Sequence, residues 1–430
     1  MPPNSQAARA IEGSRERPLA SLIARADWSR PVVWGLYLVT AGMPLYLIRW
    51  HVGPLPTTLL EVLILATCVA YIARLRQERR LWLRRTPVDI PIALLLIAGL
   101  ISIVVAFNPV AAAGIYRAYF LEAIAVFYIA VDVLDDPRDI RGLLVAAGIV
   151  SAVFSIGELI TFFVEFESGR LIITAPPAFA YTSSNSVALF LEPPLTFAAA
   201  FALFPSRPQD RWWALAFLIL LVPAAAATLS RGMYLAFVVL AIVAVVIARD
   251  VRIKLAVTAA AAAVAIALVL LPVIRERFTS IGISFLQRLV IYDQAMTVLL
   301  QKPIFGPGLA SYAQATAPLR SAHQWPNIYP HNLWLAFWSE TGLLGLISFA
   351  ATYVILFVKG WRELMRSSGF ARPLLYGAVG TLIVYFVHGL VDTPFWKNDL
   401  AVEFWLVAAL TLIGVRLSRR RDTSTEAQVS

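Results

Sequence analysis

One short stretch of the chain combines an imidazole with a carboxylate and two glycines at fixed spacing. It runs from His331 and Asn332 through Glu340 to Gly342 and Gly345, which gives the pattern HNxxLxxxxExGxxG. Histidine titrates near neutral pH and can accept a proton from a hydroxyl group. We therefore predict that His331 is a catalytic base, and that Glu340 orients a partner rather than transferring a proton. The two glycines fit close helix packing better than chemistry.

Arginines at three places could hold an anion beside this base. Arg288 precedes Tyr292 by four residues on the segment Ile281–Leu300, which is expected to form an amphipathic helix. Arg231 lies in a tight turn at the start of an apolar run, where the free N–H groups of a helix favour anions. Arginine stays charged and grips phosphate through two parallel hydrogen bonds. Arg231 and Arg288 are therefore the first candidates for binding phosphate, and Arg117 is the third.

Further polar residues are predicted to support this site. They are Tyr292, Asn332, Asn185, Glu340 and Asp392. Asn185 lies in a run of helix-capping residues. The following Glu192-Pro193-Pro194 is expected either to break that helix or, as we favour, to form a simple packing kink. Two readings of the charges stay open, because the arginines could instead form structural ion pairs with Glu192, Glu340 or Asp392. We expect no metal and no cofactor, since the outer face offers neither an Asp-x-Asp pair nor a histidine cluster.

The elements that must position these residues are membrane helices. Hydrophobic residues make up 60% of the chain and charged residues only 14%, whereas a soluble protein is about half apolar and a quarter charged. Runs such as Ile92–Phe107 and Leu343–Val358 are long enough, with their flanks, to cross ~30 Å of hydrocarbon. The predicted fold is an all-α polytopic membrane protein of about twelve transmembrane helices. The spans are predicted at 31–49, 55–73, 88–106, 115–134, 142–163, 186–204, 212–229, 232–248, 255–273, 333–358, 373–391 and 399–415.

The basic residues give this bundle an orientation. With the N-terminus inside, 26 of the 36 Lys and Arg residues fall in cytoplasmic segments, as the positive-inside rule requires. Residues 1–30 and the polar, irregular tail 416–430 are then cytoplasmic, and the transmembrane bundle 31–415 includes one large outer loop, 274–332. The net charge of +10 is explained by these topological anchors, so we predict no nucleic-acid partner. The only cysteine, Cys68, cannot form an intrachain disulfide.

Ionisable residues within the predicted spans gather on one side. They are Glu61, Arg117, Glu122, Asp132, Glu158, Glu192, Glu340, His388, Asp392 and Glu403. All except Asp132 fall in the outer half of their helices, whereas a transporter places such groups near the midplane. The distribution indicates a site that is open to the outer leaflet.

The ordered series of motifs resembles the O-antigen ligase and polymerase superfamily. It consists of Arg288-Leu-Val-Ile-Tyr292, then Pro303-Ile-Phe-Gly306-Pro-Gly308, then the histidine motif at 331–345, all within the last long outer loop and the helix after it. The resemblance covers about residues 117–399. The family usually has Trp where this chain has Tyr292, which is an exchange between aromatic residues.

This resemblance implies a metal-independent glycosyltransferase of the GT-C type in the bacterial inner (cytoplasmic) membrane. It would take a glycan from undecaprenyl diphosphate at the periplasmic leaflet. In the family, the loop histidine is the proposed base, and arginines like Arg231 and Arg288 hold the diphosphate. The acceptor would be the lipid A core for a ligase, which we favour, or another lipid-linked repeat unit for a polymerase of O-antigen or exopolysaccharide.

Two alternatives come from other classes. A flippase or transporter of lipid-linked glycans would show internal repeats and midplane charges, and neither is present in the sequence. A metal-dependent transferase of similar shape would need acidic residues in the first outer loop, and Trp50–Thr58 has none.

The topology can be tested by cysteine labelling. In a Cys68→Ala background, Ala315→Cys should react with an impermeant reagent from outside the inner membrane, because residues 274–332 are expected on that side. Labelling that requires the cell interior to be opened would overturn the orientation.

Overall fold

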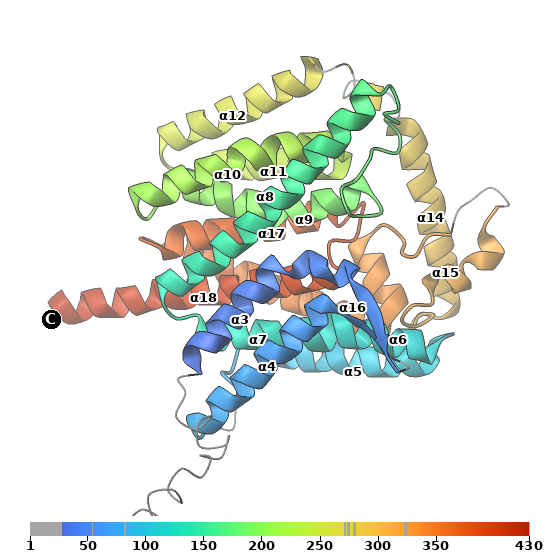
Figure 1. Cartoon of the computed structure of the whole chain (residues 1–430), viewed down its shortest axis with the longest axis horizontal. Helices are drawn as coiled ribbons and strands as arrows, with labels where there is room; N and C mark the ends of the chain where they lie inside the picture. Colours follow the sequence, from blue (N-terminus) through green and yellow to red (C-terminus); the bar gives the residue numbers. More distant parts are fainter. Residues whose placement is uncertain are drawn as a thin grey trace, which may run out of the picture.

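The computed structural model describes residues 28–429, except positions 54, 81, 82, 271, 273–275, 278–280 and 322–325. Most of the predicted segment 1–30 and parts of the predicted loop 274–332 therefore lie outside the described residues. The elements are α3 (Ser29–Ala41), η2 (Met43–Leu47), β1 (Arg49–Val52), β2 (Leu55–Thr58), α4 (Leu59–Gln77), α5 (Asp89–Val105), α6 (Pro109–Ile115), η3 (Tyr116–Glu122), α7 (Ala123–Val133), α8 (Pro137–Glu167), α9 (Ser184–Leu203), α10 (Pro208–Ala227), α11 (Arg231–Ile247), α12 (Val251–Leu270), α14 (Ile281–Gln301), α15 (Tyr312–Ala315), η4 (Ala317–Leu319), α16 (Leu333–Leu364), α17 (Ala371–His388) and α18 (Asn398–Val429). Most long helices lie side by side along one axis, while α14 stands across their ends and α18 projects from the opposite end (Figure 1).

The helices agree with the predicted spans in position. Each of the predicted spans overlaps a helix, so the all-α class is confirmed. In the described part of the chain, six helices are long and apolar enough to cross a membrane: Pro109–Val133, Pro137–Glu167, Ser184–Leu203, Pro208–Ala227, Leu333–Leu364 and Asn398–Arg420. Two more, α5 and α11, are apolar but shorter. The count of about twelve crossings and the side of the membrane that each loop faces stay predictions.

The outer surface of the bundle is apolar. Val104, Ile219 and Val69 are 81%, 77% and 66% exposed, and they belong to a large set of exposed hydrophobic side chains on α4, α5 and α10. Soluble monomers rarely expose such extended apolar surface. Hydrocarbon rather than water therefore suits this surface, in agreement with a protein that crosses the membrane several times.

The predicted spans 31–49 and 55–73 are wrong at the ends that face each other. The residues between α3 and α4 form the short 3₁₀ helix η2 and an antiparallel hairpin of β1 and β2. Thr58 and Glu61 explain the late start of α4, because they form a reciprocal capping box. The Thr58 hydroxyl accepts the Glu61 N–H at 3.1 Å, and the Glu61 carboxylate accepts the Thr58 N–H at 3.4 Å.

Two expectations of irregular structure are also wrong. Helix α9 runs through its prolines without a break, and the Thr196 hydroxyl donates to the Pro193 carbonyl at 2.8 Å. Such side-chain bonds allow membrane helices to tolerate proline. The tail 416–430 continues α18 as far as Val429. Its first residue, Arg416, donates to the carbonyls that end α7, and adding turns to an existing helix is far easier than starting one.

An aromatic core fixes the start of α16 against the loop between α17 and α18. Phe337 stacks on Phe349 with ring centroids 3.7 Å apart. Phe395 and Phe404 pack against Phe349 at centroid distances of 5.7 and 5.1 Å. All four rings are fully buried, so this cluster contributes both apolar burial and a defined geometry. The residues just before α16 and just before Phe395 are held close together as a result.

A kink in α16 accommodates the loop 303–310. Gly342 has φ 68° and ψ −177°, a conformation that favours glycine. A Cβ atom there would lie 2.5 Å from the Ile304 carbonyl oxygen. That same carbonyl accepts the N–H of Leu343 at 2.8 Å, so the loop provides a bond that the kinked helix lacks. Gly342 therefore serves backbone conformation and packing, as predicted.

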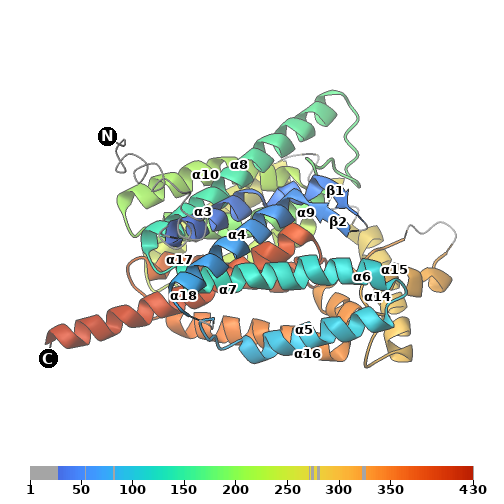
Figure 2. The same ribbon diagram turned by 60° about the horizontal axis from the view of Figure 1, so that its bottom comes forward.

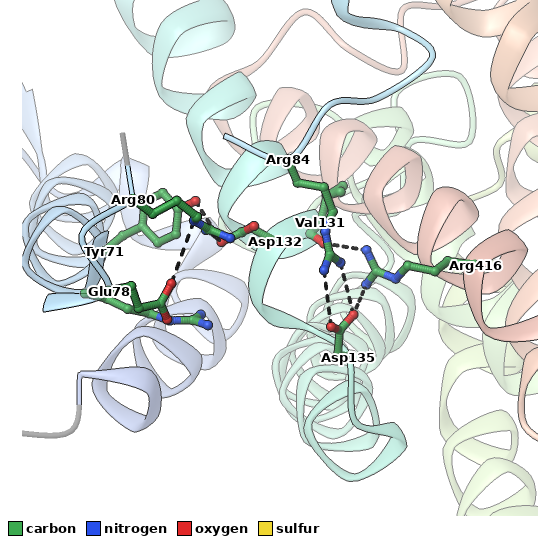
Figure 3. Close-up of polar contacts among 9 residues, drawn as sticks. Tyr71, Glu78, Arg80, Arg84, Val131, Asp132, Asp135 and Arg416 are labelled. Carbon is green, nitrogen blue, oxygen red and sulfur yellow. Dashed lines mark hydrogen bonds and ion pairs between the residues drawn. The ribbon is translucent and has the colours of Figure 1, made fainter. Parts of the chain in front are cut away.

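Charged side chains from the linker before α5 and from α18 gather around two carboxylates at the end of α7 (Figure 3). Arg80 forms an ion pair with the buried carboxylate of Asp132. Arg84 and Arg416 converge on Asp135 at 3.2 and 2.6 Å, which ties the linker before α5 and helix α18 to the end of α7. Asp132, the one ionisable span residue predicted outside the outer half, thus has a structural partner.

We expect Asp132→Ala to destabilise the fold more than Asp135→Ala. The Asp132 side chain is 0% exposed and the Asp135 side chain 40% exposed. Breaking the first pair should cost about 3 kcal/mol, the lower end for buried pairs because Arg80 keeps some contact with water. Losing the exposed group should cost about 1 kcal/mol. Thermal unfolding in detergent measures both, and equal losses would contradict the expectation.

Candidate active site

The candidate residues converge where α14, the start of α16 and the loop after α17 meet. Helix α14 lies at this end of the bundle in both ribbon views (Figures 1 and 2). The loop that follows α17 begins with a tight turn, Gly389–Asp392, in which Val391 and Asp392 both donate N–H bonds of 2.9 Å to the His388 carbonyl. This segment, called the carbonyl turn below, contacts the start of α16, helix α14 and Asn185.

The start of α16 is bonded to the carbonyl turn. The N–H of Leu333 donates to the Gly389 carbonyl at 2.7 Å. The Asn332 side-chain amide donates to the Leu390 carbonyl at 3.0 Å, while its oxygen accepts two N–H groups of the first turn of α16 at 3.0 Å. Asn332 is therefore both the cap of α16 and a link to the turn, which fixes the residue before it, His331.

Helix α14 is bonded to the same turn. The Arg288 Nε–H donates to the Val391 carbonyl at 2.9 Å. The Tyr292 hydroxyl lies 2.8 Å from the Leu390 carbonyl oxygen and 3.1 Å from the His331 carbonyl oxygen, and it can donate a hydrogen bond to either of them. Because Arg288 and Tyr292 are one helical turn apart, two contacts align α14, and the Arg288 Nη groups remain available for a further bond.

His331 and Asp392 form the central pair of the site. The His331 Nδ1 lies 3.3 Å from a carboxylate oxygen of Asp392. That carboxylate also accepts the Asn185 amide at 3.0 Å and the Thr393 N–H at 2.9 Å. The His331 side chain is 40% exposed and that of Asp392 only 8%. His331 has φ 48°, an uncommon conformation for a residue other than glycine, and such backbone strain gathers at functional sites.

This pairing sets the protonation of both groups. Burial disfavours both charges. For His331, the hydrogen bond and negative charge of Asp392 outweigh burial, so the pKa of His331 is raised. For Asp392, the bond to His331 and the nearby positive charges outweigh burial, so the pKa of Asp392 is lowered. A carboxylate can only accept, so Nδ1 carries the proton and Nε2 of the neutral imidazole is left to act as a base.

Three guanidinium groups lie near one another beside this pair. Arg231 opens α11, and its Nη1 donates to the Arg277 carbonyl at 3.3 Å. The Arg277 Nε donates to the Leu229 carbonyl, also at 3.3 Å. Burial and the neighbouring charge of Arg288 lower the pKa of Arg277, and Arg288 acts on Arg231 in the same way. Concentrated positive charge at a helix N-terminus is suited to a multiply charged anion.

Comparison with known proteins agrees with this chemistry. Residues 215–350 match the family model described as O-antigen ligase. The matched segment includes Arg231, Arg288 and the motif from His331 to Gly345, so the resemblance seen in the sequence is confirmed there. None of the curated proteins matches the chain. The match supports a membrane glycosyltransferase of the O-antigen ligase or polymerase type.

The structure brings together most of the predicted site residues. Those in contact with the carbonyl turn or the arginine group are His331, Asn332, Asp392, Asn185, Arg288, Tyr292 and Arg231. Asn185 and Asp392 lie outside the segment that matches the O-antigen ligase model. Among the described residues, no group of three or more His, Cys, Asp or Glu side chains is placed to hold a metal ion.

Arg117 is not bonded to the other candidates. Its guanidinium pairs with Glu61 at 2.8 Å and Glu122 at 3.2 Å and donates to the Pro56 carbonyl at 2.7 Å. Arg117 and Glu122 are five residues apart on the π-helix η3, whose wider turn brings such positions together. Two carboxylates already balance its charge, so these contacts favour a structural ion pair over donor binding.

Glu340 of the O-antigen ligase motif holds the loop 303–310. Its carboxylate accepts the Ala310 N–H at 2.6 Å, and its carbonyl accepts the Ser102 hydroxyl. Ser102 in turn accepts the Leu309 N–H at 3.0 Å. Glu340 is fully buried in this contact, so it orients a partner, and the partner is a loop backbone rather than His331.

Two features of the site are absent from the sequence-based interpretation. The carbonyl turn acts through backbone oxygens, which any residue supplies, so it cannot be recognised from the types of its residues. Arg277 has no distinguishing motif in the sequence, because its burial and its contact with Arg231 depend on the fold. The available signal is the string from His388 to Trp396, in which one carboxylate stands among apolar residues.

Asp392→Asn should move the acid limb of the pH–rate profile to lower pH. A base must be neutral, so activity is lost as the pH falls through the pKa of His331. Removing the negative charge lowers that pKa, by about one unit. The maximal rate should fall about ten- to a hundredfold, since the imidazole loses its orienting partner. The profile of kcat/KM for glycan transfer measures this.

Asp293→Asn is the matched control, because Asp293 is exposed and adjacent to Tyr292. Its acid limb should coincide with that of the unchanged protein. If the acid limb of Asp392→Asn is not shifted, Asp392 does not influence the pKa of His331.

Proposed function

We propose that this chain is an O-antigen ligase that transfers a glycan from undecaprenyl diphosphate to a hydroxyl of the lipid A core. The observation that carries the proposal is the half-exposed His331, bonded through Nδ1 to buried Asp392 and set on the same carbonyl turn as Arg288. A base and a phosphate ligand are thereby held together. Those are the two requirements of transfer from a sugar diphosphate.

His331 would activate the acceptor. Its Nε2 takes the proton of the acceptor hydroxyl while the hydroxyl oxygen forms a bond to the anomeric carbon of the donor sugar. The bond from that carbon to the phosphate oxygen breaks, and its electron pair leaves with the diphosphate. The Asp392 carboxylate stabilises the imidazolium that forms, because the positive charge develops 3.3 Å away. A single displacement of this kind inverts the anomeric centre.

The arginines would stabilise the leaving diphosphate. Arg288 keeps its planar fork available after the Nε bond to Val391, and Arg231 lies at the positive end of the α11 dipole. Fixed guanidinium groups interact most strongly with the charge that develops on the departing oxygen. We therefore propose that arginines take the place that a divalent cation has in metal-dependent transferases.

The position of the site suits a lipid-linked donor. It lies at the ends of apolar helices, where a diphosphate can stay at the membrane surface while its polyprenyl chain remains in hydrocarbon. We place this surface on the periplasmic side of the inner membrane. The distribution of basic residues over the loops supports that choice.

His331→Ala and Arg288→Ala should impair transfer in different ways. Loss of the base should reduce turnover about a hundred- to ten-thousandfold while the donor still binds. Loss of the phosphate ligand should weaken donor binding and turnover together, and Arg288→Lys should restore only part, because lysine lacks the planar fork. The measurements are donor affinity and single-turnover transfer from a purified polyprenyl-diphosphate oligosaccharide to lipid A core.

The controls separate the alternatives. Asp293→Asn should match the unchanged protein, and transfer should persist in EDTA. Transfer to a second lipid-linked repeat unit but not to lipid A core would identify a polymerase instead of a ligase. Full turnover in a well-folded His331→Ala protein would contradict the base assignment, and recovery that requires magnesium would contradict the metal-free mechanism.

A further inference from the structure

A second histidine–carboxylate pair lies directly behind the carbonyl turn. His388 Nδ1 and a carboxylate oxygen of Glu192 are 2.5 Å apart, and their side chains are 1% and 0% exposed. Neither residue lies in the segment 215–350 that matches the family model. The pair joins the end of α17 to α9, so it connects two helices that both contact Asp392, through the His388 carbonyl and the Asn185 amide.

His388 anchors the carbonyl turn from within. As the last residue of α17, it supplies the carbonyl that accepts the N–H groups of Val391 and Asp392. A shift of the His388 backbone would therefore move this turn. The shift would move the Val391 carbonyl that holds Arg288 and the carboxylate that holds His331. The bond from the imidazole to Glu192 ties this residue to α9 and so opposes such a shift.

The same imidazole contacts the start of α11. A Cβ atom on Gly232 would lie 2.4 Å from His388 Cδ2 and 2.5 Å from its Nε2, and 3.1 Å from a methyl group of Val391. Only glycine allows the α11 backbone to approach this closely. Since Gly232 directly follows Arg231, the position of that arginine depends on the contact with His388.

The free-energy cost of burying this pair is high for a contact that would serve stability alone. The second oxygen of Glu192 has no hydrogen-bond partner among the residues that the structure describes. Buried ion pairs are often no more stabilising than apolar side chains of the same size, and an unsatisfied buried carboxylate oxygen adds to the cost. A role in fixing the geometry of the site explains the pair better than a contribution to stability.

We propose that Glu192 and His388 are positioning residues for the transfer reaction. They fix the carbonyl turn, and through it the His331–Asp392 base and Arg288, while the contact with Gly232 aligns Arg231. This proposal rests on the function proposed above. It predicts that substituting either residue lowers turnover, although neither residue contacts a substrate.

The kinetic test compares His388→Leu with His388→Asn. The leucine variant keeps much of the volume but no bond to Glu192, and kcat should fall about ten- to a hundredfold because the reacting groups lose alignment. The asparagine amide can donate from nearly the place of Nδ1 and should recover at least part of kcat. Glu158→Gln is the matched control, since Glu158 is a fully buried carboxylate of α8 outside the site, and its kcat should stay unchanged.

A double-mutant cycle distinguishes positioning from general destabilisation. If His388 acts through Asp392, His388→Leu should cause little further loss of kcat in an Asp392→Asn background. Gly232→Ala approaches the same contact from α11, so it should raise the KM for the donor by displacing Arg231, and it provides a second variant if His388→Leu does not fold. Independent losses that multiply across the cycle would overturn the proposal.

Hydrogen exchange tests the pair independently of activity. Without any substrate, amides 389–393 should exchange at least tenfold faster in His388→Leu than in the unchanged protein, while Glu158→Gln should leave them protected. If the unchanged protein transfers no glycan, the proposed function fails, but faster exchange would still establish that the pair holds the turn. Unchanged exchange at 389–393 would refute the positioning role, even if transfer itself is confirmed.

Discussion

The site depends on one constraint, which is that the carbonyl oxygens of the turn Gly389–Asp392 take their donors from two other elements, α14 and the start of α16. A buried backbone acceptor without a partner is costly, and Gly389 is buried. The donors come from α16 and from α14, through Leu333, Asn332 and Arg288. Satisfying the turn therefore assembles the site: the same bonds that stabilise the backbone bring the proposed base, its carboxylate and the proposed phosphate ligand to one place.

The arginines at the site and those at the opposite end of the bundle have different kinds of partner. At the end away from α14, arginines meet carboxylates directly, as Arg80 meets Asp132 and Arg416 meets Asp135. At the site, the Arg288 guanidinium has no carboxylate within ion-pair distance among the described residues, and it bonds to a carbonyl instead. A carbonyl orients a guanidinium without neutralising it. The first arrangement suits structural anchoring, and the second leaves positive charge for a ligand.

Much of this could be predicted from the sequence, because the responsible signals are local. Long apolar runs predict the helices, and the ordered motifs single out Arg288 and His331, which the structure places on one turn. Their roles as anion ligand and base stay predictions. Contacts between residues that are far apart in the sequence could not be predicted in this way. Arg117 has the composition of a ligand, but a π-helical turn pairs it with Glu122. The hairpin before α4 was missed because the capping box at Thr58, rather than hydropathy, decides where that helix begins.

The relation between motif and site has a physical basis. The O-antigen ligase match at 215–350 contains the imidazole and two of the arginines, yet the carboxylate that sets the tautomer of His331 lies at Asp392, and the amide that holds this carboxylate lies at Asn185. The imidazole acquires a defined proton position only when the ends of α9 and α17 reach the start of α16. The buried pair of Glu192 and His388 joins α9 to the end of α17, and Gly232 lets α11 pack against His388. The tautomer of His331 therefore depends on helix packing around one turn. The histidine motif supplies the imidazole, but the groups that orient it come from other helices.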